Sequence, residues 1–177
     1  MKTNHIFTFM FLLVAALLYA GSESIIPEQG QAKPTVKISQ IGIKKGKGKT
    51  VYLNDKLASV KAALGKPASV SSEYFEMMEK DATVLNYGSN KLYFVDDILD
   101  SYELTESNIS VGQQGGAFFK VGDHINAVNP LIPVTALKNN WLTADIITES
   151  GTITDYFISI EVDPSFNKIK TIRINSY

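Results

Sequence analysis

The sequence predicts an α+β protein, built largely from antiparallel strands with short helices. Three observations support this class. Apolar runs of strand length are separated by turn residues, and one segment has the apolar spacing of an amphipathic helix. Residues 154–162 alternate between two sets of side chains, so one face of the predicted strand suits helices and the other suits solvent or a partner. The first set is Tyr156, Ile158, Ile160 and Val162; the second is Asp155, Phe157, Ser159 and Glu161.

The composition limits what the chain can be. It has 177 residues, of which 45% are hydrophobic and 20% charged, and it has no cysteine. This is enough for one ordinary domain or two very small ones with a real core, and it argues against disorder. Without cysteine, no disulfide, thiolate metal site or cysteine nucleophile is available.

Residues 1–22 are predicted to be a secretory signal peptide. A short polar head containing Lys2 precedes an apolar run, Ile6–Ala20, and small residues follow, with cleavage expected after Ala20 or Ser22. A helix of this run would span about 22 Å, against about 30 Å of membrane hydrocarbon. We therefore expect an exported protein, periplasmic or secreted, with no stable membrane anchor after cleavage.

Loss of the leader removes one lysine and no acid, so the net charge changes from −1 to −2. Arg173 is the only arginine. Nucleic-acid binders are typically basic and use arginine for phosphate and guanine contacts. The sequence therefore disfavours a nucleic-acid partner.

The first half of the mature chain begins with a polar, proline-containing stretch, residues 23–35, predicted as a flexible tether. Residues 36–43 indicate a strand with one irregularity, and residues 44–49 (KKGKGK) a turn. Residues 51–53 are predicted as the partner strand of a hairpin.

The clearest helix follows. Leu57, Val60 and Leu64 share one helical face, and Asn54 or Asp55 is expected to cap the start. Gly65, followed by a proline, is expected to end it.

The remaining elements are mainly strands. A second, shorter helix is predicted to start at Asp123 and to end before the prolines that follow. Residues 69–79 have an ambiguous pattern: Tyr74, Met77 and Met78 would share a helix face, but we favour a strand. The other predicted strands are 83–87, 92–95, 98–104, 141–148, 153–162 and 168–175.

The two halves of the mature chain have a similar order of elements. Each has a short strand, a short helix and then a meander, and residues 92–104 align with 158–172 as strand, acidic turn and strand. We therefore predict two degenerate tandem repeats, 36–111 with the N-terminal hairpin and 117–177. The alternative is that unrelated α+β meanders are alike at this level.

The first half resembles the BLIP-like superfamily, which contains β-lactamase inhibitor proteins and the SmpA/OmlA outer-membrane assembly lipoproteins. The resemblance rests on Leu57–Pro67 (LASVKAALGKP), then Tyr87, Leu92-Tyr93-Phe94 and Ile98. It covers 50–111 better than 117–177. The chain lacks the lipid-anchor cysteine of the assembly lipoproteins. The resemblance implies helices on one face of a curved antiparallel sheet, whose open face binds another protein.

No catalytic motif is complete. Residues 42–50 resemble a phosphate-binding loop, but the spacing is one residue too long and a strand follows where a helix is needed. His124 is the only histidine of the mature chain, so a histidine pair for zinc is not available. The carboxylates Asp96, Asp97 and Asp100 cluster at a predicted turn, which does not place two of them across a cleft as a glycosidase needs. We therefore expect no enzyme activity, no metal and no cofactor.

Charge is segregated along the chain. Residues 33–49 hold six lysines and no acid, whereas 73–106 hold nine acids and two lysines. One interpretation is that the segregation steers a charged partner. The other is that the basic hairpin lies against the acidic sheet of the same chain.

The sequence favours an exported, non-catalytic protein-binding module. Such a module would inhibit or neutralise an extracytoplasmic enzyme or toxin, or act as an envelope scaffold. The alternatives are a small-ligand or envelope-polymer binder and, less favoured, a small secreted hydrolase. A continuous apolar patch would indicate protein binding, and a deep pocket with convergent polar groups would indicate ligand binding. The predicted partner-binding residues are Trp141, Phe157, Arg173, Tyr93 and Glu103.

If the basic segment packs on the rest of the chain, deletion of residues 23–49 should lower the melting temperature measured by circular dichroism. An unchanged melting temperature would contradict internal packing.

Overall fold

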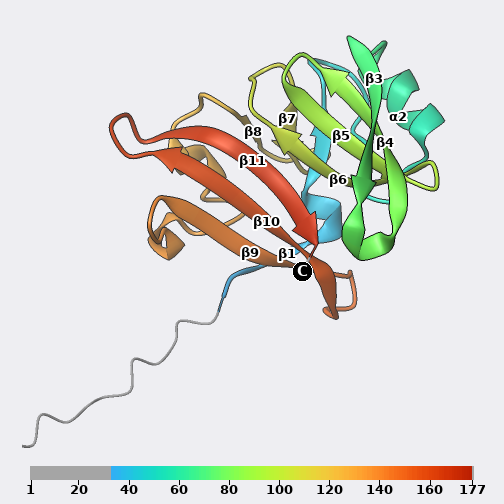
Figure 1. Ribbon diagram of the computed structural model, residues 1–177. Helices are drawn as coiled ribbons and strands as arrows, with labels where there is room; N and C mark the ends of the chain where they lie inside the picture. The colour runs from blue at the N-terminus through green and yellow to red at the C-terminus, as the bar shows by residue number, and fades with distance from the viewer. Residues whose placement is uncertain (1–32, 177) are drawn as a thin grey trace, which may run out of the picture. The chain divides into compact units, whose positions relative to one another are not determined.

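The computed structural model describes residues 33–176, and the predicted leader 1–22 and most of the predicted tether lie outside them. The described chain is mostly β-sheet, with a single α-helix in this part, α2 (Leu57–Leu64). Eight strands form a curved sheet that does not close, in the order β1-β9-β10-β11-β6-β5-β4-β3 (Figure 1). A second sheet has the order β2-β7-β8.

The element bounds follow most predicted strands closely, but the predicted strand 69–79 ends at Phe75, because residues 76–78 turn the chain as a 3₁₀ helix. The first meander is β3 (Ser69–Phe75), β4 (Lys80–Tyr87), β5 (Asn90–Val95) and β6 (Ile98–Leu104). The second is β9 (Trp141–Ile147), β10 (Ile153–Asp163) and β11 (Lys168–Ser176). The short strands are β1 (Thr35–Lys37), β2 (Gly42–Lys44), β7 (Ser110–Gly112) and β8 (Phe118–Lys120). Four 3₁₀ turns are η1 (Ile38–Gln40), η2 (Glu76–Met78), η3 (Ile125–Val128) and η4 (Val134–Ala136).

One hydrophobic cluster on the inner side of the large sheet forms the core. The helix α2 contributes Val60 and Leu64, both buried, as the apolar spacing predicts. Tyr102 is fully buried, and its hydroxyl donates to the Ile41 carbonyl at 3.1 Å. Each fully buried aliphatic side chain contributes about 1.5–3 kcal/mol. The core therefore accounts for most of the stabilisation that the sheet receives.

The N-terminal segment differs from the predicted hairpin. β1 pairs in parallel with β9, whereas β2 belongs to the other sheet, because η1 turns the chain between them. The predicted partner strand is reduced to one bridge, Ile43 with Val51, with N···O distances of 2.8 and 2.9 Å. A side chain at Gly42 would collide with Tyr52, so the glycine allows this close approach.

The predicted tether ends earlier than residue 35. The Pro34 carbonyl accepts from the Asp145 backbone amide at 2.9 Å, and Thr35 begins β1. The structure thus attaches the last three residues of the predicted tether, 33–35, to the sheet. Residues 23–32 lie outside the described part.

Both helix starts differ from prediction. Lys56, not Asn54 or Asp55, is the N-cap of α2, because the Asp55 carboxylate instead accepts from the Tyr52 amide at 2.8 Å. The end is confirmed: Gly65 adopts a φ of 81°, which suits glycine. The predicted second helix is only the 3₁₀ turn η3, with His124 as its cap.

The basic segment does not pair with the acids of residues 73–106. Its ion pairs go to Asp145, from Lys33, and to Glu149, from Lys37. The segment nevertheless lies against the sheet of the same chain, since Tyr102 donates to the Ile41 carbonyl and Lys45 lies over the Tyr87 ring. Apolar contacts attach the segment instead, through the buried side chains Val36, Ile41 and Ile43.

Asn90 ties the loop after β6 to the β4–β5 turn. It is fully buried, and its Oδ1 accepts from the amides of Thr105 and Glu106 at 2.7 and 2.9 Å. Its Nδ2 donates to the Glu106 carbonyl at 3.3 Å and to Asn108 Oδ1. One side chain thus satisfies four polar groups of this loop.

We expect Asn90→Ala to lower the free energy of unfolding by about 2–3 kcal/mol, because polar groups of the 105–108 loop lose their partner. Asn90→Asp should be similarly damaging, since its second oxygen cannot donate to Glu106 and Asn108. Urea unfolding measures both. The control is Asn86→Ala, which removes a hydrogen bond to Ser71 in an exposed setting; it should change stability by less than about 0.5 kcal/mol. Equal effects would contradict this role of Asn90.

Candidate binding face

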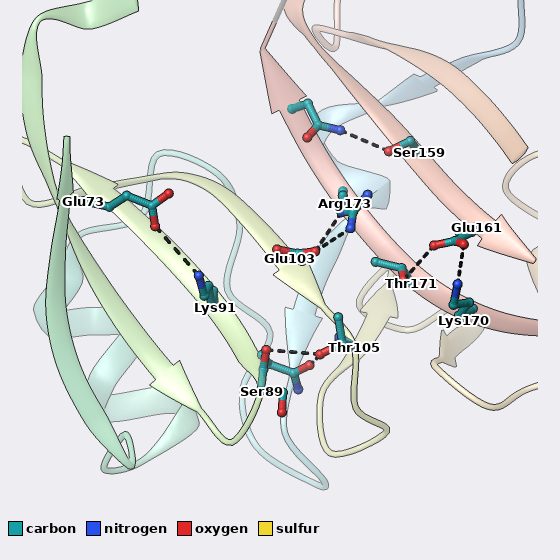
Figure 2. A network of polar contacts seen from close by, with 12 residues as sticks. Glu73, Ser89, Lys91, Glu103, Thr105, Ser159, Glu161, Lys170, Thr171 and Arg173 are labelled. Carbon is teal, nitrogen blue, oxygen red and sulfur yellow. Dashed lines mark hydrogen bonds and ion pairs between the residues drawn. The ribbon is translucent and has the colours of Figure 1, made fainter. Parts of the chain in front are cut away.

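The five residues predicted to bind a partner lie on one face of the large sheet, opposite the core. In the register, Arg173 is directly opposite Glu103, and Trp141 is directly opposite Glu161. Lys91 is directly opposite Glu103, and Tyr93 is two residues further along the same strand as Lys91. Phe157 is four residues before Glu161 on its strand, so it shares the side of Glu161. Because side chains alternate along a strand, these positions point to the same side. We call this side the outer face (Figure 2).

An ion pair lies at the centre of the outer face. Arg173 donates to Glu103 Oε1 from Nε at 2.9 Å and from Nη2 at 2.6 Å. The Arg173 guanidinium carbon also lies 5.8 Å from the centre of the Trp141 ring. Both partners of the ion pair are partly exposed. The contact therefore holds β11, β6 and β9 side chains together in a region that water still reaches.

Polar contacts continue to the β9–β10 side of the face. Asn175 Nδ2 donates to Ser159 Oγ at 3.0 Å, and Lys170 Nζ lies 2.7 Å from Glu161 Oε1 (Figure 2). The hydrogen bond from Lys170 is the main cause that lowers the pKa of Glu161. Lys33 Nζ lies 5.1 Å from the centre of the Phe157 ring. The aromatic rings of this part of the face are thus already next to cations of the same chain.

A groove of about 570 Å³ lies on the outer face. β3 and η2 form one side, and β5, β6 and β11 form the other. The rings of Phe75 and Tyr93 lie 5.5 Å apart between centres, tilted by 43°. Tyr74 is 58% exposed. The residues that line the groove include Glu73, Tyr74, Phe75, Glu76, Tyr93, Ser101, Glu103, Arg173 and Asn175.

Acidic residues dominate the electrostatics at Tyr93. The pKa of Tyr93 is raised to about 12, first by burial and then by the carboxylates of Glu73 and Glu103, while Arg173 acts to lower it. A phenolate is disfavoured near carboxylates because like charges repel. Tyr93 thus reports a negative potential in the groove.

The outer face is not the continuous apolar patch expected of a protein-binding sheet. Its centre is polar, and of the large hydrophobic side chains that are most exposed, only Tyr74 lines the groove. The sequence analysis missed Glu73, Tyr74, Phe75 and Glu76 as groove residues. The signal was two aromatic residues flanked by two acids in residues 73–76, but the pattern did not show which face of the sheet they would reach.

The carboxylates predicted to cluster have separate structural roles. Asp96 and Asp97 form the β5–β6 turn with positive φ values, and Asp96 pairs with Lys80 at 2.5 Å. Asp100 accepts from the Tyr156 hydroxyl at 2.8 Å. No group of three or more acidic or histidine residues that could hold a metal ion occurs in residues 33–176. Within the same range, no helix is long and apolar enough to cross a membrane.

Comparisons with models of known protein families, with curated proteins and with solved structures gave no match. The resemblance to the BLIP-like superfamily therefore stays a prediction.

We expect opposite shifts of the Tyr93 pKa in two variants of the ion pair. Glu103→Gln should lower it, because a repelling carboxylate is lost while Arg173 remains. Arg173→Gln should raise it, because an attracting cation is lost. Ring-carbon NMR of labelled tyrosine across pH 10–12 measures both shifts, with circular dichroism to confirm that the chain stays folded. Tyr156, whose pKa of about 12 depends first on burial and then on Asp100, is the internal control. Shifts of the same sign would contradict this account.

Proposed function

We propose that the protein is an exported, non-catalytic binding module that holds a protein partner on the outer face. The observation that carries this proposal is that five residues from five strands converge on one open face, next to a groove of about 570 Å³. Aromatic and arginine side chains are favoured anchors at protein interfaces. The polar centre suits a partner that is bound and released rather than a permanent subunit, since permanent interfaces are more apolar.

The arrangement also supports a degenerate repeat. In our proposal, β3–β6 with α2 and β9–β11 with η3 and η4 correspond to the two predicted units, 36–111 and 117–177, of BLIP-like type. Inhibition or neutralisation of an extracytoplasmic enzyme or toxin is one use of such a module, and an envelope scaffold is another. Both need a stable sheet that presents side chains without moving.

A polysaccharide of the cell envelope is the second candidate ligand. The groove favours it through the rings of Tyr74 and Tyr93, on which sugars stack, and through the polar groups of Ser101 and Asn175. Pockets with a few convergent polar groups are typical of small-ligand sites.

Affinity capture tests the proposal. Residues 23–177 are immobilised and exposed to an extracytoplasmic extract of the native host at low and moderate salt. We expect one protein to be enriched, and to be lost with Tyr93→Ala and weakened at least tenfold with Trp141→Ala or Phe157→Ala. The matched control is Phe166→Ala, because Phe166 is 68% exposed but lies in the β10–β11 turn. Equal loss with the control, or no enriched protein at either salt, would contradict a protein partner. Retention on an envelope polysaccharide column, lost with Tyr93→Ala, would favour the second candidate.

A further inference from the structure

We infer that the groove receives a basic side chain, lysine or arginine, from an extended segment of the partner. The inference rests on the proposed function, because it names the chemistry of the partner for the same face. Carboxylates, aromatic rings and the overall charge distribution each support it.

The carboxylates of the groove exceed its cations. Glu73, Glu76 and Glu103 line it, and Arg173 is the one basic residue among the side chains that line it. Both hydrogen bonds of Arg173 go to Glu103. Glu73 lies 3.8 Å from Lys91, a long contact between two half-exposed groups, and Glu76 has no ion pair in the described chain. The groove therefore has negative charge to offer to an incoming cation.

The aromatic residues are placed to accept the same cation. Phe75 and Tyr93 form a tilted pair whose ring centres lie 5.5 Å apart. The face of an aromatic ring attracts ammonium and guanidinium groups, by about 0.5–2 kcal/mol depending on how far water is excluded. An acidic ligand would gain nothing from these rings and would be repelled by the glutamates.

The outer face already holds its own cations in this way. Arg173 lies between the Trp141 ring and the Glu103 carboxylate, and Lys33 contacts both Phe157 and Asp145. In each case one basic side chain is shared by a ring and a carboxylate. The groove also combines aromatic rings, Phe75 and Tyr93, with the carboxylates of Glu73 and Glu76, and Arg173 is the one basic residue that lines it.

The charge of the whole domain favours the approach of a basic partner to this face. Residues 67–177 contain 15 acidic and 7 basic residues, whereas 42–66 contain one acidic and seven basic. The groove is built only from the acidic part. A field of one sign steers an oppositely charged partner and raises its association rate. The volume, within the range of ligand pockets, admits a side chain with its flanking backbone.

The test uses NMR titration of residues 23–177 with three synthetic peptides: a lysine–serine–glycine repeat, its arginine counterpart and its glutamate counterpart. We expect both basic peptides to shift the backbone amides of Tyr93, Glu103 and Arg173, with affinities at least tenfold above that of the glutamate peptide. Glu73→Gln with Glu76→Gln should weaken the basic peptides at least tenfold. Both residues are exposed, so the melting temperature of this double variant should stay unchanged.

The matched control removes two negative charges far from the groove. Asp123→Asn with Asp163→Asn lies near the start of β11, about 20 Å along the strand from Asn175, and asparagine keeps the oxygens that accept from Lys120 and Ser165. This control should change affinity less than twofold. Equal weakening by the two double variants, or equal binding of the glutamate peptide, would overturn the inference.

The two proposals fail in different ways. A captured partner could be lost with Tyr93→Ala but unaffected by Glu73→Gln with Glu76→Gln. The proposal that the outer face binds a protein would then stand, and the inference that the groove receives a basic side chain would be overturned. If neither variant alters capture, the outer face itself is overturned.

Discussion

The pairing of β11 with β6 is the constraint on which the rest of this structure depends. It is only three residue pairs long, and it joins the two meanders into one sheet. Ile172 with Leu104 and Ile174 with Tyr102 point into the core and are at most 2% exposed. Arg173 with Glu103 points outward. The apolar pairs dominate the energy, because partly exposed ion pairs contribute about 0–1 kcal/mol. The ion pair instead determines which charged groups stand at the centre of the outer face.

Because the apolar pairs of β11 and β6 point into the core and the charged pair points outward, the outer face is polar at its centre. A strand whose alternate residues enter the core leaves the others on the opposite face, and at the centre of this face those others are mostly polar, among them Ser159, Thr171, Glu103, Lys91 and Arg173. Most aromatic rings on the face lie close to a basic or a second aromatic side chain. One side of the groove is the exposed edge strand β3 with η2, and the other side is formed by β5, β6 and β11.

The basic and acidic segments that are separate in the sequence do not neutralise each other in the fold. The lysines of residues 44–49 do not neutralise the acids of β3–β6; Lys44 and Lys45 instead lie over the rings of Phe118 and Tyr87, at 3.5 and 5.5 Å. Only some of the acids are paired, and then locally, as Asp96 is with Lys80 and Glu103 with Arg173. Local pairing leaves both the basic loop and the acidic groove available to other molecules.

The sequence by itself determined most strands, α2 and its end at Gly65, and the five residues of the outer face, because period-two alternation and helical spacing are local properties of the chain. It could not determine that β1 pairs with β9, that Asp55 binds Tyr52 instead of capping α2, or that the second helix is a 3₁₀ turn. Partners distant in sequence decide these, and a short segment follows its partners more than its propensity. The groove was likewise a tertiary outcome: Glu73, Phe75 and Glu76 belong to a segment of ambiguous pattern. Only the pairing of β3 with β4 brings their side chains over Tyr93 and Arg173.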